Sequence, residues 1–399
     1  MSSCSSWYSV TYFINFGEFM SDLKKIAWIG GYPAHYMCEL HTRLEEKFPG
    51  RIHFFYVEAG KKLRDQRTYE RGMLPNACEI IRDDSYFRVF RLMKKISQMD
   101  PGLIITASHY PRPIWLSALY FMLKKKNICY WSDTNIQDIF FKPVWWQFAK
   151  KTIFGFYLKK MFRLLYMGRQ NKNFYIWATN RLIFDKKKLF FPYPHNHAYY
   201  SDARDENLHE GNHPFTVVSV GRLNMVKRYD LLIEGISLLP KKIRDNFICH
   251  IAGDGPEKDA LIQKAKNLNV DHLVNFAGPV PSDEVMKFFQ KGNLFILPSD
   301  IEPWGLVVNE ALSSGVPVAA PYWVGAASDL VVDGETGILL PDNNPGSIAQ
   351  AIIRLYERDD WGKHLGIQGQ DRVRTMGFHV EKAVENFCKL VEDFDAQSA

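Results

Sequence analysis

The sequence has few cysteines, and their spacing excludes two kinds of stabilised fold. Six occur in 399 residues, and no two of them form a Cys-x-x-Cys pair. This spacing argues against a disulfide framework and against a zinc site. It favours a protein of the reducing cytoplasm, with no metal centre. The cysteines are at positions 4, 38, 78, 129, 249 and 388.

Long apolar runs are also missing. The longest, Ile114–Leu123, contains one serine and is about half as long as a membrane-spanning helix, so no transmembrane helix is predicted. Residues 1–19 contain neither Lys nor Arg and therefore lack the charged start of a secretory signal. We interpret residues 1–19 as a disordered extension, with Met20 as an alternative start.

The composition is that of a folded protein, but its charge is unevenly divided. Hydrophobic residues make up 46% and charged residues 24%, and the length predicts two domains. Residues 1–200 hold 31 Lys and Arg against 15 Asp and Glu, whereas residues 201–399 hold 19 against 29. A basic half joined to an acidic half indicates that one domain faces an anionic surface or acceptor.

Short apolar strands alternate with helices through the second half. The run Phe215–Val220 ends in Gly221 and is followed by a helical pattern, and this unit recurs. Because parallel strands need crossover helices, the pattern predicts a parallel sheet covered on both faces. Strands are expected at 215–220, 247–252, 273–276, 294–297 and 316–319, and helices at 229–239, 256–267, 282–290 and 307–314.

The first half shows the same pattern more weakly. The stretch Leu189–Asp205 is rich in Pro, His, Asn and Tyr, fits neither period, and is predicted to be a linker. The fold class is therefore α/β, with two doubly wound domains facing a central cleft. We place them at 20–195 and 196–379, followed by a helical segment at 380–399. In the first half, strands are expected at 24–29, 51–57, 103–106 and 128–131, and helices at 36–47 and 114–125.

Open parallel sheets bind ligands in the loops that follow their strands. In one such loop two carboxylates, Glu302 and Glu310, flank a Pro-Trp-Gly turn that opens a helix. Both carboxylates can point into one cleft. The free backbone N–H groups of Trp304, Gly305 and Leu306 are expected at the start of that helix, where they can bind hydroxyl or anionic oxygens.

Two further loops carry residues suited to phosphate. Arg222 and Lys227 follow a strand and offer a pyrophosphate a bidentate fork and a point charge, although a solvated helix start is the alternative. The pair Gly30-Gly31 follows the first strand, where backbone can approach a phosphate closely. An ordinary turn is the alternative for these glycines.

These motifs resemble the signature of the family 4 glycosyltransferases with the GT-B fold. The chain carries E-P-W-G-L-x-x-x-E followed by A-L-x-x-G-x-P-V, and G-R-L…K, G-D-G-P and D-G-x-T-G occur in matching order. The resemblance covers residues 215–355. It departs from the family at 324–329, where V-G-A-A-S-D replaces the usual Gly-Gly and Glu, so the diphosphate contacts of that loop are not carried over.

The resemblance implies a role for each matched residue. Glu310 would accept hydrogen bonds from the ribose of a sugar nucleotide, and Glu302 would hold the transferred sugar. Arg222 and Lys227 would neutralise the diphosphate leaving group, in place of a metal. No cofactor is implied. The implied donor-binding set is Gly30, Gly31, Arg222, Lys227, Gly253, Val280, Glu302, Trp304, Gly305, Leu306 and Glu310.

His109 and Asp133 each follow a predicted strand of the first half. His109 is placed like a family histidine that contacts the donor sugar, and either residue is a candidate acid–base or acceptor-orienting group. A satisfied side chain at a strand end is the alternative for both. The predicted catalytic set is accordingly Glu302, Arg222, Lys227, His109 and Asp133.

Aromatic and basic residues are interleaved through Phe140–Arg169. This composition suits a helix lying in an anionic lipid interface. It suits equally an amphipathic helix whose apolar face lies in the core. Nucleic acid is disfavoured as a partner, because no base-reading motif accompanies the stretch.

The resemblance implies retaining, metal-independent transfer of a hexose-type sugar from a nucleoside-diphosphate sugar to an acceptor hydroxyl. The acceptor is expected to be lipid-linked or a polysaccharide, at the cytoplasmic face of the plasma membrane. Two alternatives stay open: a GT-B sugar-nucleotide epimerase or phosphorylase, and a non-catalytic sugar-nucleotide-binding subunit.

Overall fold

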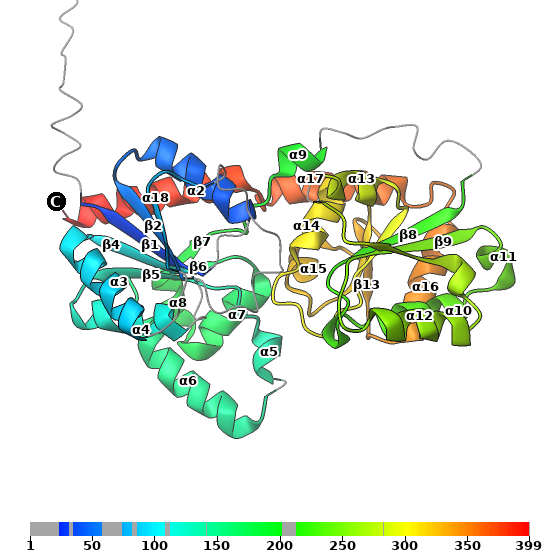
Figure 1. Ribbon diagram of the computed structural model, residues 1–399, viewed down its shortest axis with the longest axis horizontal. Helices are drawn as coiled ribbons and strands as arrows, with labels where there is room; N and C mark the ends of the chain where they lie inside the picture. The colour runs from blue at the N-terminus through cyan, green and yellow to red at the C-terminus, as the bar shows by residue number, and fades with distance from the viewer. Residues whose placement is uncertain are drawn as a thin grey trace, which may run out of the picture.

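The chain forms two α/β domains, shown side by side in Figure 1. A computed structural model describes residues 24–31, 35–57, 74–81, 86–107, 112–140, 142–201, 213–281 and 283–398. The extension predicted at residues 1–19 and the candidate His109 lie outside these described residues. Each domain is built on one sheet in which every strand pair is parallel, so the predicted fold class is confirmed.

The N-terminal sheet has seven strands in the order β3-β2-β1-β4-β5-β6-β7. All five residues of the central strand β1 are buried, as expected for a parallel sheet covered on both faces. The strands are β1 (Ile26–Gly30), β2 (Ile52–Val57), β3 (Cys78–Ile81), β4 (Leu103–Ala107), β5 (Asn127–Trp131), β6 (Arg163–Tyr166) and β7 (Lys188–Phe190). The helices are α2 (His35–Lys47), α3 (Tyr86–Met99), α4 (Arg112–Leu123), α5 (Ile136–Phe140), α6 (Val144–Lys159), α7 (Arg169–Ala178), α8 (Arg181–Lys187) and α9 (His197–Ser201).

The C-terminal sheet has six strands in the order β10-β9-β8-β11-β12-β13. Its helices begin with local signals: Asn344 caps α16 by accepting a hydrogen bond from the Ser347 N–H, and Pro345 follows at the first helical position. The strands are β8 (Phe215–Val220), β9 (Phe247–Ala252), β10 (Val274–Gly278), β11 (Leu294–Ile296), β12 (Val318–Pro321) and β13 (Gly337–Leu340). The helices are η4 (Met225–Lys227), α10 (Tyr229–Ser237), α11 (Lys241–Arg244), α12 (Lys258–Asn267), η5 (Asp271–Leu273), α13 (Val285–Gln290), α14 (Leu306–Ser313), α15 (Gly325–Leu330), α16 (Pro345–Tyr356), α17 (Lys363–Thr375) and α18 (Val380–Ser398).

The strand orders place one switch point in each sheet. In the first sheet the order of the strands reverses between β1 and β4, which lie side by side and parallel, and in the second it reverses between β8 and β11. Ligands of open parallel sheets bind outside the carboxyl ends of the strands at such a point. The loops after β8 and β11 are therefore the first places to search for a site in the second domain.

The last helix, α18, crosses from the second domain to the first, where it packs against α2 and β7 (Figure 1). Arg51, at the start of β2, donates to Asp395 at 2.5 Å, and Phe387 packs its ring 6.0 Å from that of Trp28. At the other end of the helix, a hydrogen bond from His379, together with a smaller effect of the Arg43 charge, lowers the pKa of Glu381 to about 2. The chain's end thus ties the two domains together.

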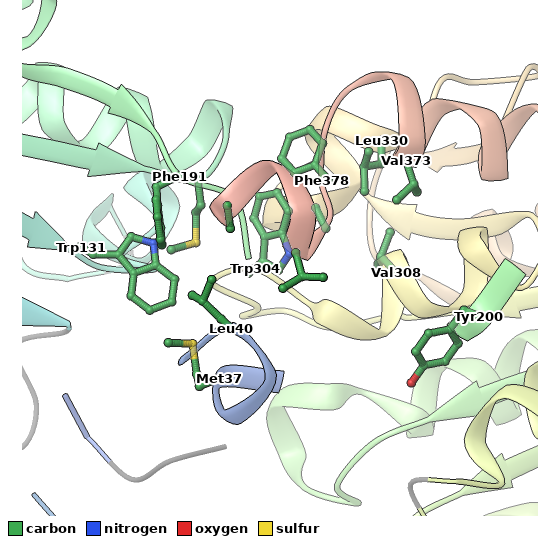
Figure 2. Packing of buried hydrophobic residues seen from close by; sticks show 14 of the residues in the cluster. Met37, Leu40, Trp131, Phe191, Tyr200, Trp304, Val308, Leu330, Val373 and Phe378 are labelled. Atoms are coloured by element: carbon green, nitrogen blue, oxygen red, sulfur yellow. The ribbon is translucent and has the colours of Figure 1, made fainter. Parts of the chain in front are cut away.

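A single apolar cluster runs through both domains. Figure 2 shows Trp131 and Phe191 of the first domain and Trp304 and Phe378 of the second among its buried side chains. The indole of Trp304 stacks 5.2 Å from the Phe378 ring. Because this cluster is continuous across the domain boundary, the two domains share buried surface as well as a covalent link.

Two sequence-based expectations about the first domain are wrong. The stretch Phe140–Arg169 is not one helix, because α6 ends at Lys159 and strand β6 begins at Arg163. The predicted linker contains the end of β7, since Leu189 pairs with Leu165 inside the sheet. Pro, His and Tyr around this short strand hide its alternation.

No helix among the described residues is both long and apolar enough to span a bilayer.

Candidate active site

The loops after β8 and β11 meet through an ion pair. The Lys227 ammonium lies in close contact with Oε2 of Glu302, and the two side chains are only 17% and 15% exposed. Lys227 ends η4 in the first loop, and Glu302 lies in the second. The ion pair therefore bridges the switch point of the C-terminal sheet, which is where the fold predicts a ligand.

The loop that holds Lys227 is fixed by short-range contacts. The Asn224 side chain caps η4 by accepting from the Lys227 N–H at 3.3 Å. The next residue, Arg228, has a left-handed backbone and donates to Asp230 at 3.0 Å and to Asp300 at 2.8 Å. These hydrogen bonds raise the pKa of Arg228. Arg228 is thus occupied in holding the two loops together, which leaves Lys227 as the cation facing Glu302.

The turn that carries Glu302 needs its glycine. Gly305 has a φ of +87°, and a Cβ there would lie 2.9 Å from Cγ of Glu302. Gly305 is also the N-cap of α14, and among the described residues the N–H groups of Gly305 and Leu306 donate to no backbone oxygen of a turn or cap. These N–H groups belong to the unsatisfied first turn of a helix, where an anion or hydroxyl can accept from them.

The turn's tryptophan serves packing through its side chain. Trp304 is 3% exposed, and its indole N–H donates to Oδ1 of Asn309 at 3.0 Å. Its ring stacks on Tyr193 of the first domain with a centroid distance of 6.1 Å. The side chain is thus engaged in packing, which leaves the backbone amide as the predicted ligand contact. The burial of the indole fixes that amide in position.

The other predicted donor-side residues lie in this domain with different surroundings. Arg222 is exposed, and its side chain makes no hydrogen bond or ion pair with another described residue, whereas Glu310 is 2% exposed inside α14. A Cβ at Gly253 would overlap the carbonyl oxygen of Gly221, so this glycine permits the close approach of the β8 and β9 ends. Val280 follows β10 and packs at the edge of the shared apolar cluster.

A buried carboxylate of the first domain lies in a loop that reaches the second domain. Asp133 follows β5, and its Oδ2 accepts a hydrogen bond from the Tyr193 hydroxyl at 3.4 Å. Burial raises the pKa of Asp133, the Tyr193 hydrogen bond lowers it, and the nearby charge of Glu302 raises it. Asn135, in the same loop, donates to the backbone oxygen of Trp323 at 2.8 Å. Asn135 also donates to the backbone oxygen of Glu302 at 3.5 Å, so the loop of Asp133 contacts the turn of Glu302 across the domain boundary.

The predicted glycine pair lies at the end of β1. Gly30 pairs with Tyr56 in the sheet, and a Cβ there would meet its nearest atoms at ordinary contact distance, 3.5 Å. Packing therefore does not demand a glycine at position 30. Gly31 follows it and is half-buried.

Sequence reasoning missed three residues that join the domains beside the site. Tyr193 and Asn135 make the contacts just described, and Asp329, in the loop that departs from the family pattern, accepts from the backbone N–H of Arg169 at 2.8 Å. Burial raises the pKa of Asp329. Asp329 binds the start of α7 with its carboxylate. No local pattern announces such contacts, because each partner lies over 50 residues away.

Among the described residues, no group of three or more His, Cys, Asp or Glu side chains is arranged to hold a metal ion.

The C-terminal half is similar to a family of known proteins. Residues 201–372 match the family "Glycosyl transferases group 1". The D-inositol 3-phosphate glycosyltransferase of Corynebacterium diphtheriae is 31% identical over 160 residues, covering 39% of this chain and 37% of that protein. An uncharacterized glycosyltransferase of Methanocaldococcus jannaschii is 31% identical over 199 residues, covering 49% of this chain and 52% of that protein. The chain thus aligns with half or less of the length of most such relatives.

Solved structures match the fold over nearly the whole chain. The Anabaena protein HepE in complex with UDP superposes with a TM-score of 0.72 at 18% identity, covering 92% of this chain and all of that one. Sucrose-phosphate synthase from Thermosynechococcus elongatus gives a TM-score of 0.71 at 20% identity, covering 94% of this chain and all of that one. The protein therefore has the GT-B fold.

The two kinds of match agree. Residues 201–372 match the group 1 glycosyltransferases, and the GT-B fold of the solved structures extends over both sheets. The resemblance to family 4-type glycosyltransferases that the motifs indicate is confirmed.

Proposed function

We propose that this protein is a retaining glycosyltransferase that moves a sugar from a nucleoside-diphosphate sugar to an acceptor hydroxyl without a metal ion. The observation that carries the proposal is the Lys227–Glu302 ion pair at the switch point of the C-terminal sheet. The loop of Asp133 reaches the same turn from the other domain, where Asn135 donates to the Glu302 backbone oxygen at 3.5 Å. A cation for a leaving diphosphate and carboxylates for sugar hydroxyls occur together there.

Donor binding exchanges the partners of Lys227. Without a ligand its ammonium is neutralised by Glu302. An incoming diphosphate carries more charge than one carboxylate, so Lys227 turns to it, and exposed Arg222 adds a second cation. The two cations stabilise the negative charge that develops on the diphosphate as it leaves.

The released Glu302 then serves the sugar. Its carboxylate accepts hydrogen bonds from sugar hydroxyls, and the N–H groups of Gly305 and Leu306 donate to the same group. Gly305 keeps Glu302 close to the start of α14. The sugar is thus held between a carboxylate and a helix N-terminus, while Glu310 in the same helix takes the ribose.

Transfer replaces one bond at the anomeric carbon with another on the same face. The acceptor oxygen bonds to that carbon as the carbon–phosphate-oxygen bond breaks, and the acceptor's proton passes to the departing phosphate oxygen. Asp133 orients the acceptor hydroxyl beside Glu302. Burial and the nearby charge of Glu302 raise the pKa of Asp133. A hydroxyl group that donates a hydrogen bond to this carboxylate is therefore a favourable partner, because it stabilises the buried charge.

The acceptor is lipid-linked or a polysaccharide, and transfer takes place at the cytoplasmic face of the plasma membrane. The charge division supports this part of the proposal, because the first half carries 31 cationic against 15 anionic side chains. A basic domain is drawn to polyanionic chains and to anionic lipid.

A thermal-shift panel tests donor binding before the acceptor is known. UDP, GDP, ADP, CMP and dTDP are each added in EDTA and in magnesium, since a ligand that binds the folded state raises its stability. We expect one nucleoside diphosphate to stabilise the protein in EDTA. The variant Lys227→Ala should lose most of that shift, while Lys266→Ala, which removes an exposed lysine of α12, should keep it.

A labelled donor then separates transfer from the two alternatives. Label that moves from the sugar nucleotide into a larger product supports transfer. Label found only in free sugar species would favour an epimerase or phosphorylase, and nucleotide binding with neither transfer nor donor hydrolysis would identify a non-catalytic subunit.

A further inference from the structure

Helix α6 projects from the first domain at the end away from α18 (Figure 1). One side of it is anchored in the domain. Gly155, Tyr157 and Leu158 are buried, and the Tyr157 ring packs edge-on against Tyr130 with a centroid distance of 5.7 Å. This anchor fixes which side of the helix is left facing outward.

The outward side of α6 is aromatic. Trp145, Phe148, Thr152 and Phe156 follow one another at spacings of three and four, which places them on one side of a helix. Trp145 is 71%, Phe148 72% and Phe156 62% exposed. The Thr152 hydroxyl donates to the Phe148 carbonyl at 3.0 Å, so the one polar group of the row is satisfied within the helix.

This clustering is unusual for the molecule. Five Phe or Trp side chains of the described residues are more than half exposed, and four of them lie between residues 140 and 156. The apolar side chains Val144 and Ile153 extend the same surface, with 79% and 56% exposed. Scattered exposed apolar residues need no explanation, but a contiguous patch marks a binding surface. We call the exposed side chains of residues 140–156 the α6 face.

The segment that carries the α6 face is strongly basic. Residues 139–184 contain nine Lys and Arg and neither Asp nor Glu. Lys142, Lys151, Lys159 and Lys160 are exposed, and none of them appears among the salt bridges of the described residues. The ammonium of Lys160 instead lies 5.9 Å from the centre of the Phe156 ring. Charge and apolar surface are thus presented together.

We propose that the α6 face docks on an anionic phospholipid bilayer. Aromatic rings settle at the boundary between headgroups and acyl chains, and lysines beside them bind the anionic headgroups. A second copy of the chain fits the face poorly, because the exposed Lys142, Lys151, Lys159 and Lys160, which form no salt bridge among the described residues, would meet the same four lysines of the other copy. The inference rests on the proposed function, which it deepens by naming the surface that brings the enzyme to a lipid-linked acceptor.

Vesicle co-sedimentation of the full-length protein tests the docking. Phosphatidylcholine vesicles are compared with vesicles that also contain phosphatidylglycerol, for wild type and three triple variants. The aromatic variant is W145S/F148S/F156S, and the charge variant is K151Q/K159Q/K160Q. The matched control, K241Q/K242Q/K266Q, removes the same charge from exposed lysines of the second domain.

We expect wild type to bind the anionic vesicles and to bind neutral vesicles far more weakly. Three lysines near an anionic surface contribute about a 100-fold gain in affinity, so the charge variant should bind anionic vesicles about 100-fold more weakly than wild type. The aromatic variant should lose at least about tenfold, because apolar area no longer inserts. The control should stay within about twofold of wild type.

Three results would overturn the proposal. Equal losses in the charge variant and the control would make the attraction non-specific. Equal binding to neutral and anionic vesicles would remove the role of the lysines. Absence of vesicle binding, with light scattering showing a dimer that the aromatic variant abolishes, would make the face a self-association surface.

Nucleotide binding is measured in every variant, so that the two proposals fail separately. All three variants should keep the thermal shift of wild type, because the α6 face lies outside the predicted donor site. A protein that binds anionic vesicles but no nucleotide would contradict the proposed function and leave the docking surface standing.

Discussion

Replacing Glu302 with Gln is expected to separate nucleotide binding from sugar transfer. The substitution keeps the shape of the side chain and removes the charge that neutralises Lys227. Both side chains of the pair are mostly buried, at 15% and 17% exposed. Free UDP or another nucleoside diphosphate has no sugar for Glu302 to hold, so it gains from a released Lys227.

The magnitude follows from the competition for Lys227. Two unit charges about 4 Å apart attract by about 4 kcal/mol at an effective dielectric constant of about 20. Loss of hydration and of side-chain freedom offsets most of this, and measured pairs near a surface retain about 1 kcal/mol. We therefore expect E302Q to bind the nucleoside diphosphate about fivefold more tightly. Transfer should fall about 100-fold or more, because the sugar loses a preorganised acceptor.

Lys227→Ala is expected to act in the opposite direction on binding. It removes a charged hydrogen bond to the diphosphate, about 1.5–3 kcal/mol, so affinity should fall about 10- to 150-fold. If Glu302 affects the free nucleotide only through Lys227, the double variant should bind like K227A alone.

Isothermal titration calorimetry measures these affinities, and a labelled donor measures transfer. Two results would refute the reasoning. The first is an E302Q protein that binds the nucleotide as weakly as K227A. The second is wild-type transfer by both variants.

Three further predictions concern the first domain, the β-strand ends and the terminal helix. Tyr193→Phe removes a hydrogen bond to the Asp133 carboxylate, so the pKa of Asp133 should rise and the acidic limb of the transfer pH profile should move to higher pH. An unchanged profile would show that Asp133 takes no part in the reaction. Gly253→Ala forces a Cβ onto a backbone oxygen and should cost more than about 3 kcal/mol in thermal denaturation, whereas Gly278→Ala, with open space around it, should cost about 1–2 kcal/mol from its left-handed backbone alone. Hydrogen bonding holds the pKa of Glu381 at about 2 in the folded state, below its ordinary 4.5. The contribution of Glu381 to stability is therefore present above about pH 4.5 and is lost as the pH falls toward about 2. Over that range the melting temperature of wild type should fall more steeply than that of Glu381→Gln.

The fold of the second domain could be predicted well because its signals are local. The strand expected at Phe215–Val220 has those bounds, and so does the strand expected at Phe247–Ala252. Each is a short apolar run that ends at a glycine. Backbone geometry explains one of these glycines, because a side chain at Gly253 would overlap the end of β8. Pattern and structure agree here because the parallel sheet is buried on both faces.

The first domain was harder to predict because its short strands lack such runs. Strand β3, Cys78–Ile81, is only half-buried throughout, and β7 has three residues in a stretch of polar and aromatic composition. Strand β6 begins with Arg163 directly after a basic, aromatic helix. These strands are set by their neighbours in the sheet, which a local pattern does not contain.

The candidate site, too, could be predicted from the sequence only in part. The turn from Glu302 to Gly305 could be predicted, because glycine and the helix that follows are local signals. The contacts of Tyr193 with Asp133 and with Trp304 could not, because they depend on how the two domains are oriented. That Trp304 stacks between domains, with only its amide left for a ligand, likewise follows from the tertiary structure alone.

The anomeric configuration of the first sugar released tests the central claim most directly. Retaining transferases pass the donor sugar slowly to water when no acceptor is present, so proton NMR of that hydrolysis in EDTA needs no acceptor. An α-linked donor should release the α-sugar first, with the β-form appearing only at the rate of spontaneous mutarotation, and K227A should release neither at a comparable rate. Initial release of the β-sugar, or release that stops in EDTA and resumes with magnesium, would contradict retaining, metal-independent transfer.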